Sequence, residues 1–193
     1  MLVFDVETMG VESTTVILSA AILYLDTNKE NTWESLYADS LFIKFSVKDQ
    51  VENYNRTFDK NTIEWWNKQC HNVKKQSFFP SKNDLPAYEG IEIIRDYIRE
   101  HCNPDNTLIW TRGSLDQMSI DSLCKAVGTD LLVSYSNYRD MRTYVDLVAT
   151  NPKRGYCDID ASKYPGTWDR NVVMKHNPID DIVLDALQLL YPE

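Results

Sequence analysis

Three runs of apolar and β-branched residues in the first 45 positions restrict the possible folds more than any other feature of the sequence. Such runs are typical of β-strands, and they cover residues 2–7, 14–25 and 41–45. Farther along, residues 85–101 repeat apolar side chains every three or four positions, which is the spacing of one helix face. Strands followed mainly by helices predict an α/β fold in which a mixed sheet is flanked by helices.

The last helix is the most clearly marked element. Asn177 provides a cap, and Pro178 occupies the first helical position, where a missing N–H is tolerated. Apolar residues then follow along one face as far as Leu190. Similar signals predict helices at 59–69, 116–127 and 139–150, a strand at 107–110, a turn at 112–114 and a loop at 152–168. The chain of 193 residues has no internal repeat or linker, which predicts a single domain over residues 1–193.

The composition excludes several classes of protein. Apolar residues make up 43% and charged residues 25%, the balance of a soluble globular chain. No apolar run approaches the roughly 18 residues that cross a bilayer, and the N-terminus lacks the basic flank of a signal peptide. The four cysteines lie far apart with no C-x-x-C pair, so we expect reduced thiols, no structural zinc, and a cytoplasmic location.

The net charge of −9, from 29 acidic and 20 basic residues, argues against a simple nucleic-acid coat protein. Such a protein gains its affinity by neutralising phosphates and is normally basic. The negative charge does not exclude an enzyme whose acidic residues hold metal ions, because the bound cations would then contact the phosphates in place of basic side chains.

Two acidic residues in the first strand are the first candidates for chemistry. Residues i and i+2 of a strand point to the same face, so Asp5 and Glu7 project together while Phe4 and Val6 face the core. Adjacent carboxylates repel each other unless a cation or proton lies between them, and their hard oxygen atoms suit Mg²⁺ or Mn²⁺. The alternative is an edge strand whose acidic side chains simply face water.

Two further sites come later in the chain. Asp116 lies in the first turn predicted for a helix, where an acidic residue is also favoured by the helix dipole alone. His176 falls on the loop before the last helix and Asp181 on the first turns of that helix. A histidine beside metal-bound water can act as a general base, although for His176 taken alone an ordinary surface histidine is the better interpretation.

Taken in order, these residues resemble the DEDDh family of 3′→5′ exonucleases, in particular its phage exonucleases and bacterial exoribonucleases. The resemblance spans residues 4–181 and rests on five stretches: Phe4-Asp5-Val6-Glu7-Thr8-Met9-Gly10, Thr62-Ile63-Glu64-Trp65-Trp66, Arg112-Gly113 ahead of Asp116, Arg139-Asp140-Met141-Arg142-Thr143, and His176 separated from Asp181 by four residues. It implies a ribonuclease H-like fold with a mixed five-stranded sheet. Asp180 precedes Asp181, so the last acidic position could shift by one, although the spacing favours Asp181.

The resemblance also implies a mechanism and a substrate. Two ions, Mg²⁺ or Mn²⁺, would be held by Asp5, Glu7, Asp116 and Asp181, with His176 as the general base. The substrate would be nucleic acid with a free, single-stranded 3′ end, cut to nucleoside 5′-monophosphates. Its expected contacts are Thr8 and Met9 with the terminal nucleotide, and Trp66 rather than Trp65 against a base. Basic side chains that could face phosphates are Arg112, Arg139, Arg142, Lys153, Arg154 and Lys175.

Several alternatives stay open at this point. A non-catalytic nucleic-acid-binding or replication-accessory module on the same fold would be expected to lose one or more of the acidic residues, yet all are present. A plain acidic interaction protein would use its carboxylates only as a solvated surface. The sequence does not choose between DNA and RNA, and it leaves a homodimer open. A phage-encoded protein of this kind would act in the host cytoplasm.

Overall fold

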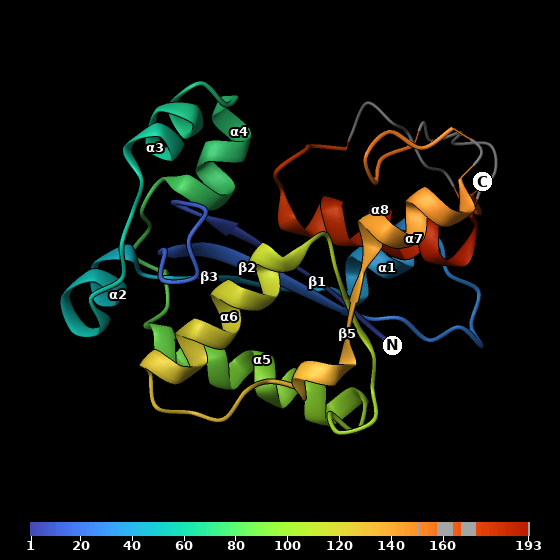
Figure 1. The fold of residues 1–193 in the computed structure, drawn as a ribbon, viewed down its shortest axis with the longest axis horizontal. Coiled ribbons are helices and arrows are strands. Elements are labelled where there is room, and N and C mark those ends of the chain that lie inside the picture. The colour runs from blue at the N-terminus through green and yellow to red at the C-terminus, as the bar shows by residue number, and fades with distance from the viewer. Residues whose placement is uncertain (150, 158–163, 167–172, 193) are drawn as a thin grey trace.

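The computed structural model describes residues 1–149, 151–157, 164–166 and 173–192, and its centre is a five-stranded mixed sheet (Figure 1). The strands lie in the order β3-β2-β1-β4-β5. β1 pairs antiparallel with β2 and parallel with β4, so the sheet is mixed as predicted. The strands are β1 (Leu2–Thr8), β2 (Ile17–Tyr24), β3 (Leu41–Lys44), β4 (Ile109–Thr111) and β5 (Tyr138–Asp140).

Helices cover both faces of the sheet (Figure 1). α5 and α6 pack on one face, and α1 and α8 pack on the other. The helices are α1 (Trp33–Asp39), α2 (Val47–Tyr54), α3 (Lys60–Asn67), α4 (His71–Val73), α5 (Ala87–His101), α6 (Ser114–Ala126), α7 (Met141–Val148) and α8 (Pro178–Leu190), with a π-helical turn η1 (Lys74–Phe78) and a 3₁₀ turn η2 (Tyr135–Asn137).

The alternation of side chains along β1 decides where the acidic residues lie. Leu2, Phe4 and Val6 enter the core beneath α5 and α6. Val3 points to the opposite face, into the core formed with α8. Because side chains two positions apart share a face, Asp5 and Glu7 continue the row of Val3 toward α8. The predicted orientation of this strand is confirmed.

α3, α4 and η1 form a small lobe beyond one end of the sheet, beside the first turn of α8 (Figure 1). Its core consists of Leu18, Trp66 and Val73, with Met9 and Met174 packed against them. Met9 follows β1 directly and Met174 lies just before α8. The lobe is therefore anchored to the two segments that carry predicted site residues.

The structure differs from the predicted elements mainly where the elements are short. The strand β5 occupies residues 138–140, part of which was predicted as the start of a helix at 139–150; the helix α7 begins only at Met141. β5 has three residues and an exposed side, so its pairing with β4, rather than its own pattern, defines it. The seven-residue α1 buries only Trp33 and Leu36, too few for a periodic signal, and α2 was also missed.

In the part of the chain that is described, every helix is too short or too polar to cross a bilayer. The cytoplasmic location stays a prediction. Of the predicted loop at 152–168, residues 152–157 and 164–166 have no regular secondary structure, and the rest lie outside the described residues.

Gly90 lies where α5 approaches β3 most closely, and this predicts a reversal of the usual effect of alanine. A Cβ atom on Gly90 would lie 2.4 Å from Cε1 of Phe45 and 3.1 Å from Cγ2 of Ile43. Glycine to alanine inside a helix ordinarily stabilises by about 1 kcal/mol, but overpacking a core costs about 1–3 kcal/mol. We therefore expect Gly90→Ala to lower the free energy of unfolding in urea. Glu89→Ala, an exposed neighbour, is the matched control and should change it little; a more stable Gly90→Ala protein would contradict the packing described.

Candidate active site

The end of β1 brings the first two acidic residues to the edge of the α8 layer. Asp5 and Glu7 are both partly buried and lie opposite Ala21 and Ser19 of β2. The register of the pairing between β1 and β2 shifts between Glu7 and Thr8. Such irregularities occur often beside active sites, because they end the pairing and redirect the side chains.

Asp116 approaches the same place from another element. It lies in the first turn of α6 and is 5% exposed. The chain reverses before it through Gly113, whose φ of +97° suits glycine. The N–H of Arg112 donates to Oδ2 of Asp116 over 3.1 Å, which fixes the carboxylate against the turn. α6 begins at Ser114, two residues earlier than predicted, and so Asp116 is a first-turn residue as expected.

The start of α8 carries the remaining residues, and its two adjacent acidic side chains make different contacts. Oδ2 of Asp180 accepts the N–H of Met174 over 2.7 Å, and Asp180 is 3% exposed. Oδ2 of Asp181 accepts the N–H of His176 over 3.0 Å. Both acidic residues thus hold the loop that carries His176, but only Asp181 lies close to Glu7 and His176. The spacing that favoured Asp181 is consistent with this arrangement.

His176 is held in a defined position at the mouth of the site. Its Nδ1 lies 3.7 Å from Oε1 of Glu7, and its ring meets that of Trp65 edge-on at 4.7 Å between centroids. Its φ of +66° is unusual for a residue with a side chain. Backbone of this kind costs of order 1 kcal/mol and persists where surrounding contacts impose it, frequently at functional sites.

The acidic side chains raise one another's pKa, which shows that they share one electrostatic environment. Burial raises the pKa of Asp5 well above its ordinary value, and the charges of Asp116, Glu7, Asp181 and Asp185 add to the rise. Burial likewise raises the pKa of Asp116, to which Glu7 and Asp185 contribute. The same causes raise the pKa of Asp181 to about 7. Without a cation, the folded protein therefore disfavours the ionised site.

The residues present fit a divalent cation. Oδ2 of Asp5 is buried and, among the described residues, has no hydrogen-bond partner, although a buried polar atom nearly always has one. Ligand atoms of Glu7, His176 and Asp181 all lie within 4.8 Å of one another. Carboxylate oxygen atoms are the ligands that Mg²⁺ and Mn²⁺ prefer, so Asp5, Glu7, Asp116 and Asp181 form a suitable set of donors.

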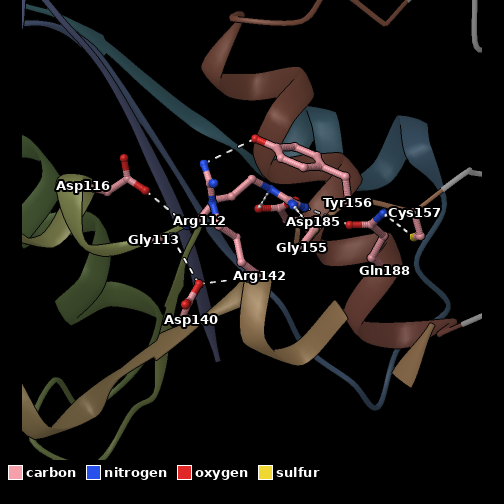
Figure 2. A network of polar contacts seen from close by, with 10 residues as sticks. All are labelled: Arg112, Gly113, Asp116, Asp140, Arg142, Gly155, Tyr156, Cys157, Asp185 and Gln188. Carbon is pink, nitrogen blue, oxygen red and sulfur yellow. Dashed lines mark hydrogen bonds and ion pairs between the residues drawn. The ribbon is translucent and has the colours of Figure 1, made fainter. Parts of the chain in front are cut away.

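Arg112 joins the elements around the acidic cluster (Figure 2). Its guanidinium donates to Asp185 through Nε, at 3.1 Å, and through Nη2. It also donates to Oε1 of Gln188 over 2.9 Å and to the carbonyl of Gly155 over 2.5 Å. The side chain of Arg112 is 16% exposed. The expectation that Arg112 faces phosphates is therefore not supported, because a buried carboxylate already binds it.

Asp185 is a fifth acidic residue near the site that the sequence analysis missed. It is 5% exposed, and its charge raises the pKa of Asp5, Asp116 and Asp181. A signal was present in the sequence, because Asp185 follows Asp181 by four residues and positions i and i+4 share a helix face. The ion pair with Arg112 offsets part of the charge of Asp185.

The two adjacent tryptophans differ in exposure, and the buried one is Trp66, for which contact with a base was expected. Trp66 is fully buried: its Nε1 donates to the carbonyl of Thr8 over 2.9 Å, and its ring stacks on Phe78. It offers no surface on which a base could stack. Trp65 is 38% exposed and touches His176. Of the other expected contacts, Thr8 donates its hydroxyl to the carbonyl of Gly10, and the partly buried Met9 packs against the lobe.

The ion pair of Arg112 yields a prediction about stability. Arg112→Met leaves Asp185 charged and unpaired beside the other carboxylates, and breaking a buried pair in this way costs about 3–5 kcal/mol. We expect urea unfolding to show that loss in the free energy of unfolding of Arg112→Met. In the double variant, Asp185→Asn removes the unpaired charge, so it should recover part of the lost stability. The control is Arg99→Met, which removes an exposed ion pair with Asp96 and should change little. Equal stability of the single and double variants would contradict the pairing.

The raised pKa of Asp181 predicts a pH dependence of stability in the metal-free protein. The folded-state pKa of Asp181, about 7, exceeds the ordinary value of 3.8. The protonated side chain therefore contributes fully to the free energy of unfolding below about pH 3.8, and that contribution is lost as the pH rises to about 7. Measured in chelator, the free energy of unfolding of Asp181→Asn relative to the wild-type chain should increase over that range. A difference that does not vary with pH would show that Asp181 ionises normally.

Comparison with known proteins identifies the family. The sequence model of the 3'-5' exoribonuclease Rv2179c-like domain matches residues 1–186. The chain is also 29% identical to an exodeoxyribonuclease of Enterobacteria phage T4 over 206 residues, which cover 98% of this chain and 87% of the relative. Exonucleases of this kind have the ribonuclease H-like fold and generally depend on divalent metal ions, and the match confirms the predicted resemblance. The chain belongs to the 3'-5' exoribonuclease Rv2179c-like family and is a 3'-5' exonuclease.

Proposed function

We propose that the chain removes nucleotides from single-stranded 3′ ends as nucleoside 5′-monophosphates, with Asp5, Glu7, Asp116 and Asp181 holding two divalent ions, Mg²⁺ or Mn²⁺. The observation that carries the proposal is the buried Oδ2 of Asp5, which has no hydrogen-bond partner within the described part of the chain and lies among carboxylates that raise the pKa of Asp5. Four carboxylates carry a charge of −4, which two divalent ions would neutralise before a phosphodiester enters. Bound ions would supply an activated water and stabilise the departing 3′ oxygen.

His176 is the proposed proton acceptor. Its backbone N–H is bound by Asp181, and its Nδ1 faces Glu7, so the ring has little freedom to turn away from the acidic cluster. The ring of Trp65 meets the ring of His176 edge-on. The side chain is still 42% exposed, which leaves it accessible to a substrate and to solvent that removes the proton. A histidine ordinarily titrates close to neutral pH, as a general base requires. The hydrogen bond with Glu7 and the charges of Glu7 and Asp181 raise the pKa of His176, and a cation bound to those carboxylates would oppose that rise.

The contacts with the terminal nucleotide are proposed for Thr8 and Met9, which directly follow the metal-binding pair on β1. Trp65 takes the stacking role first expected of Trp66, since it is the tryptophan with an exposed surface beside His176. Stacking on an aromatic side chain contributes about 1–3 kcal/mol per base and tolerates any base. Trp65→Ala should therefore raise KM more than it lowers kcat.

The choice of sugar stays open, because the family description names an exoribonuclease and the phage relative is an exodeoxyribonuclease. Matched deoxy- and ribo-oligomers in one assay would decide it. A homodimer and a cytoplasmic location likewise stay predictions. All five predicted positions hold ionisable side chains, and this supports the catalytic proposal over a non-catalytic module.

Asp5→Asn tests the ligand assignment. It keeps the size of the side chain but removes its charge, so we expect mononucleotide release to fall by at least about 100-fold, in line with the loss of a metal ligand's contribution to catalysis. The assay follows a 3′-labelled single-stranded oligomer with Mg²⁺ or Mn²⁺, beside the same oligomer labelled at the 5′ end. Melting temperature in chelator checks that the fold is retained.

Asp105→Asn is the control, since Asp105 is an exposed acidic residue on the loop after α5. It should retain full activity. Near-normal turnover by Asp5→Asn would overturn the ligand assignment, and early release of long labelled fragments would indicate an endonuclease instead.

A further inference from the structure

We propose that the lobe of α3, α4 and η1 binds the nucleic-acid strand that leads to the active site, through a basic and aromatic track. The track consists of Trp65, Lys68, His71, Lys74, Lys75 and Phe79. This inference rests on the proposed function and extends it, because it assigns a surface to the nucleotides on the 5′ side of the one removed.

Charge is strongly segregated in this chain. Residues 60–83 contain five lysines and one glutamate, a net charge of +4, although the whole chain carries −9. The segment contains the whole of the lobe. Because phosphate neutralisation supplies most of the affinity of single-strand binding, a basic lobe beside an acidic site is the arrangement that a polyanionic strand requires.

The aromatic residues of the lobe form a continuous series of ring contacts that begins at the active site. The series emerges at the surface at both ends, since Trp65 is 38% and Phe79 37% exposed, and His71 is exposed. Exposed rings of this kind are platforms for bases. The contacts, by distance between centroids, are His176–Trp65 at 4.7 Å, Trp65–Trp66 at 5.1 Å, Trp66–Phe78 at 5.6 Å, Phe78–Phe79 at 6.1 Å and Phe79–His71 at 5.8 Å.

Two of the lysines, Lys68 and Lys74, lie beside these rings. Lys68 follows Trp65 by three residues, at the end of α3, and so lies near it on the helix surface. Nζ of Lys74 lies 5.6 Å from the centre of the Phe79 ring and donates to the carbonyl of Asn67 over 3.1 Å. Lys68 and Lys75 are exposed and form no ion pair with any described residue. Their charges are therefore available to a ligand.

Single-stranded nucleic acid fits this surface better than an acidic peptide does. A strand offers phosphates to the lysines and bases to the rings at once, whereas a peptide would leave the rings without a matching partner. The track also begins at Trp65, which touches the proposed general base. A strand whose terminal nucleotide lies in the acidic cluster would reach Trp65 with its next nucleotides.

The test compares a long and a short substrate. In the variant K68Q/K74Q/K75Q, we expect kcat/KM for a single-stranded 20-mer to fall about 10-fold or more, while kcat/KM for a dinucleotide with the same 3′ end stays within about twofold. Each phosphate contact contributes about 0.7 to the slope of log affinity against log salt for single strands. The slope for the 20-mer should therefore become shallower by about 2.

Two further variants keep the test decisive. K68Q/K75Q leaves Lys74 and its bond to Asn67 intact, and it should show the same trend with a slope change of about 1. Lys125→Gln is the matched control, an exposed lysine at the far end of α6, and should leave both substrates and the salt slope unchanged. Melting temperatures show whether each variant is folded.

The outcomes separate this inference from the function on which it rests. Equal losses of kcat/KM on the 20-mer and the dinucleotide, or an unchanged salt slope, would overturn the proposed track. Tight binding of an acidic peptide by the protein would also overturn it if the lysine variants had no effect on the 20-mer. A wild-type chain that cleaves neither substrate would overturn the proposed function itself.

Discussion

Repulsion among buried carboxylates is the constraint that the rest of the structure must satisfy. Asp5, Asp116 and Asp181 come from a central strand and two helices, and burial together with their mutual charge raises the pKa of each. A chain does not gain stability from such a cluster. It persists because the core on both faces of the sheet fixes β1, α6 and α8, and because Arg112 forms an ion pair with Asp185 beside it. Under the proposed function, bound cations would relieve the repulsion among these carboxylates.

Much of this arrangement follows from local pattern. The alternation along β1 separates Phe4 and Val6 from Asp5 and Glu7, and it needs only the two-residue period of a strand. The Asn177-Pro178 start of α8 likewise fixes the order of loop histidine and helical aspartate. Both predictions depend on nearest neighbours in the chain, and the structure agrees with both.

The features that sequence reasoning missed depend on contacts between distant segments. Trp65 and Trp66 are adjacent, and only the packing of the lobe against Leu18 and Phe78 decides which of them is buried. Pairing with β4 defines β5, whose three residues carry no pattern of their own. The positive charge of the lobe could not be seen in the composition, because the net charge of −9 sums the lobe with an otherwise acidic chain.

The most direct test of the account is a crystal structure of the protein with Mn²⁺, in which anomalous scattering locates the ions. The account predicts two manganese peaks bound by oxygen atoms of Asp5, Glu7, Asp116 and Asp181, with Oδ2 of Asp5 now engaged. Crystals that show no manganese at these side chains, or ions held elsewhere while Oδ2 of Asp5 stays unpartnered, would contradict it.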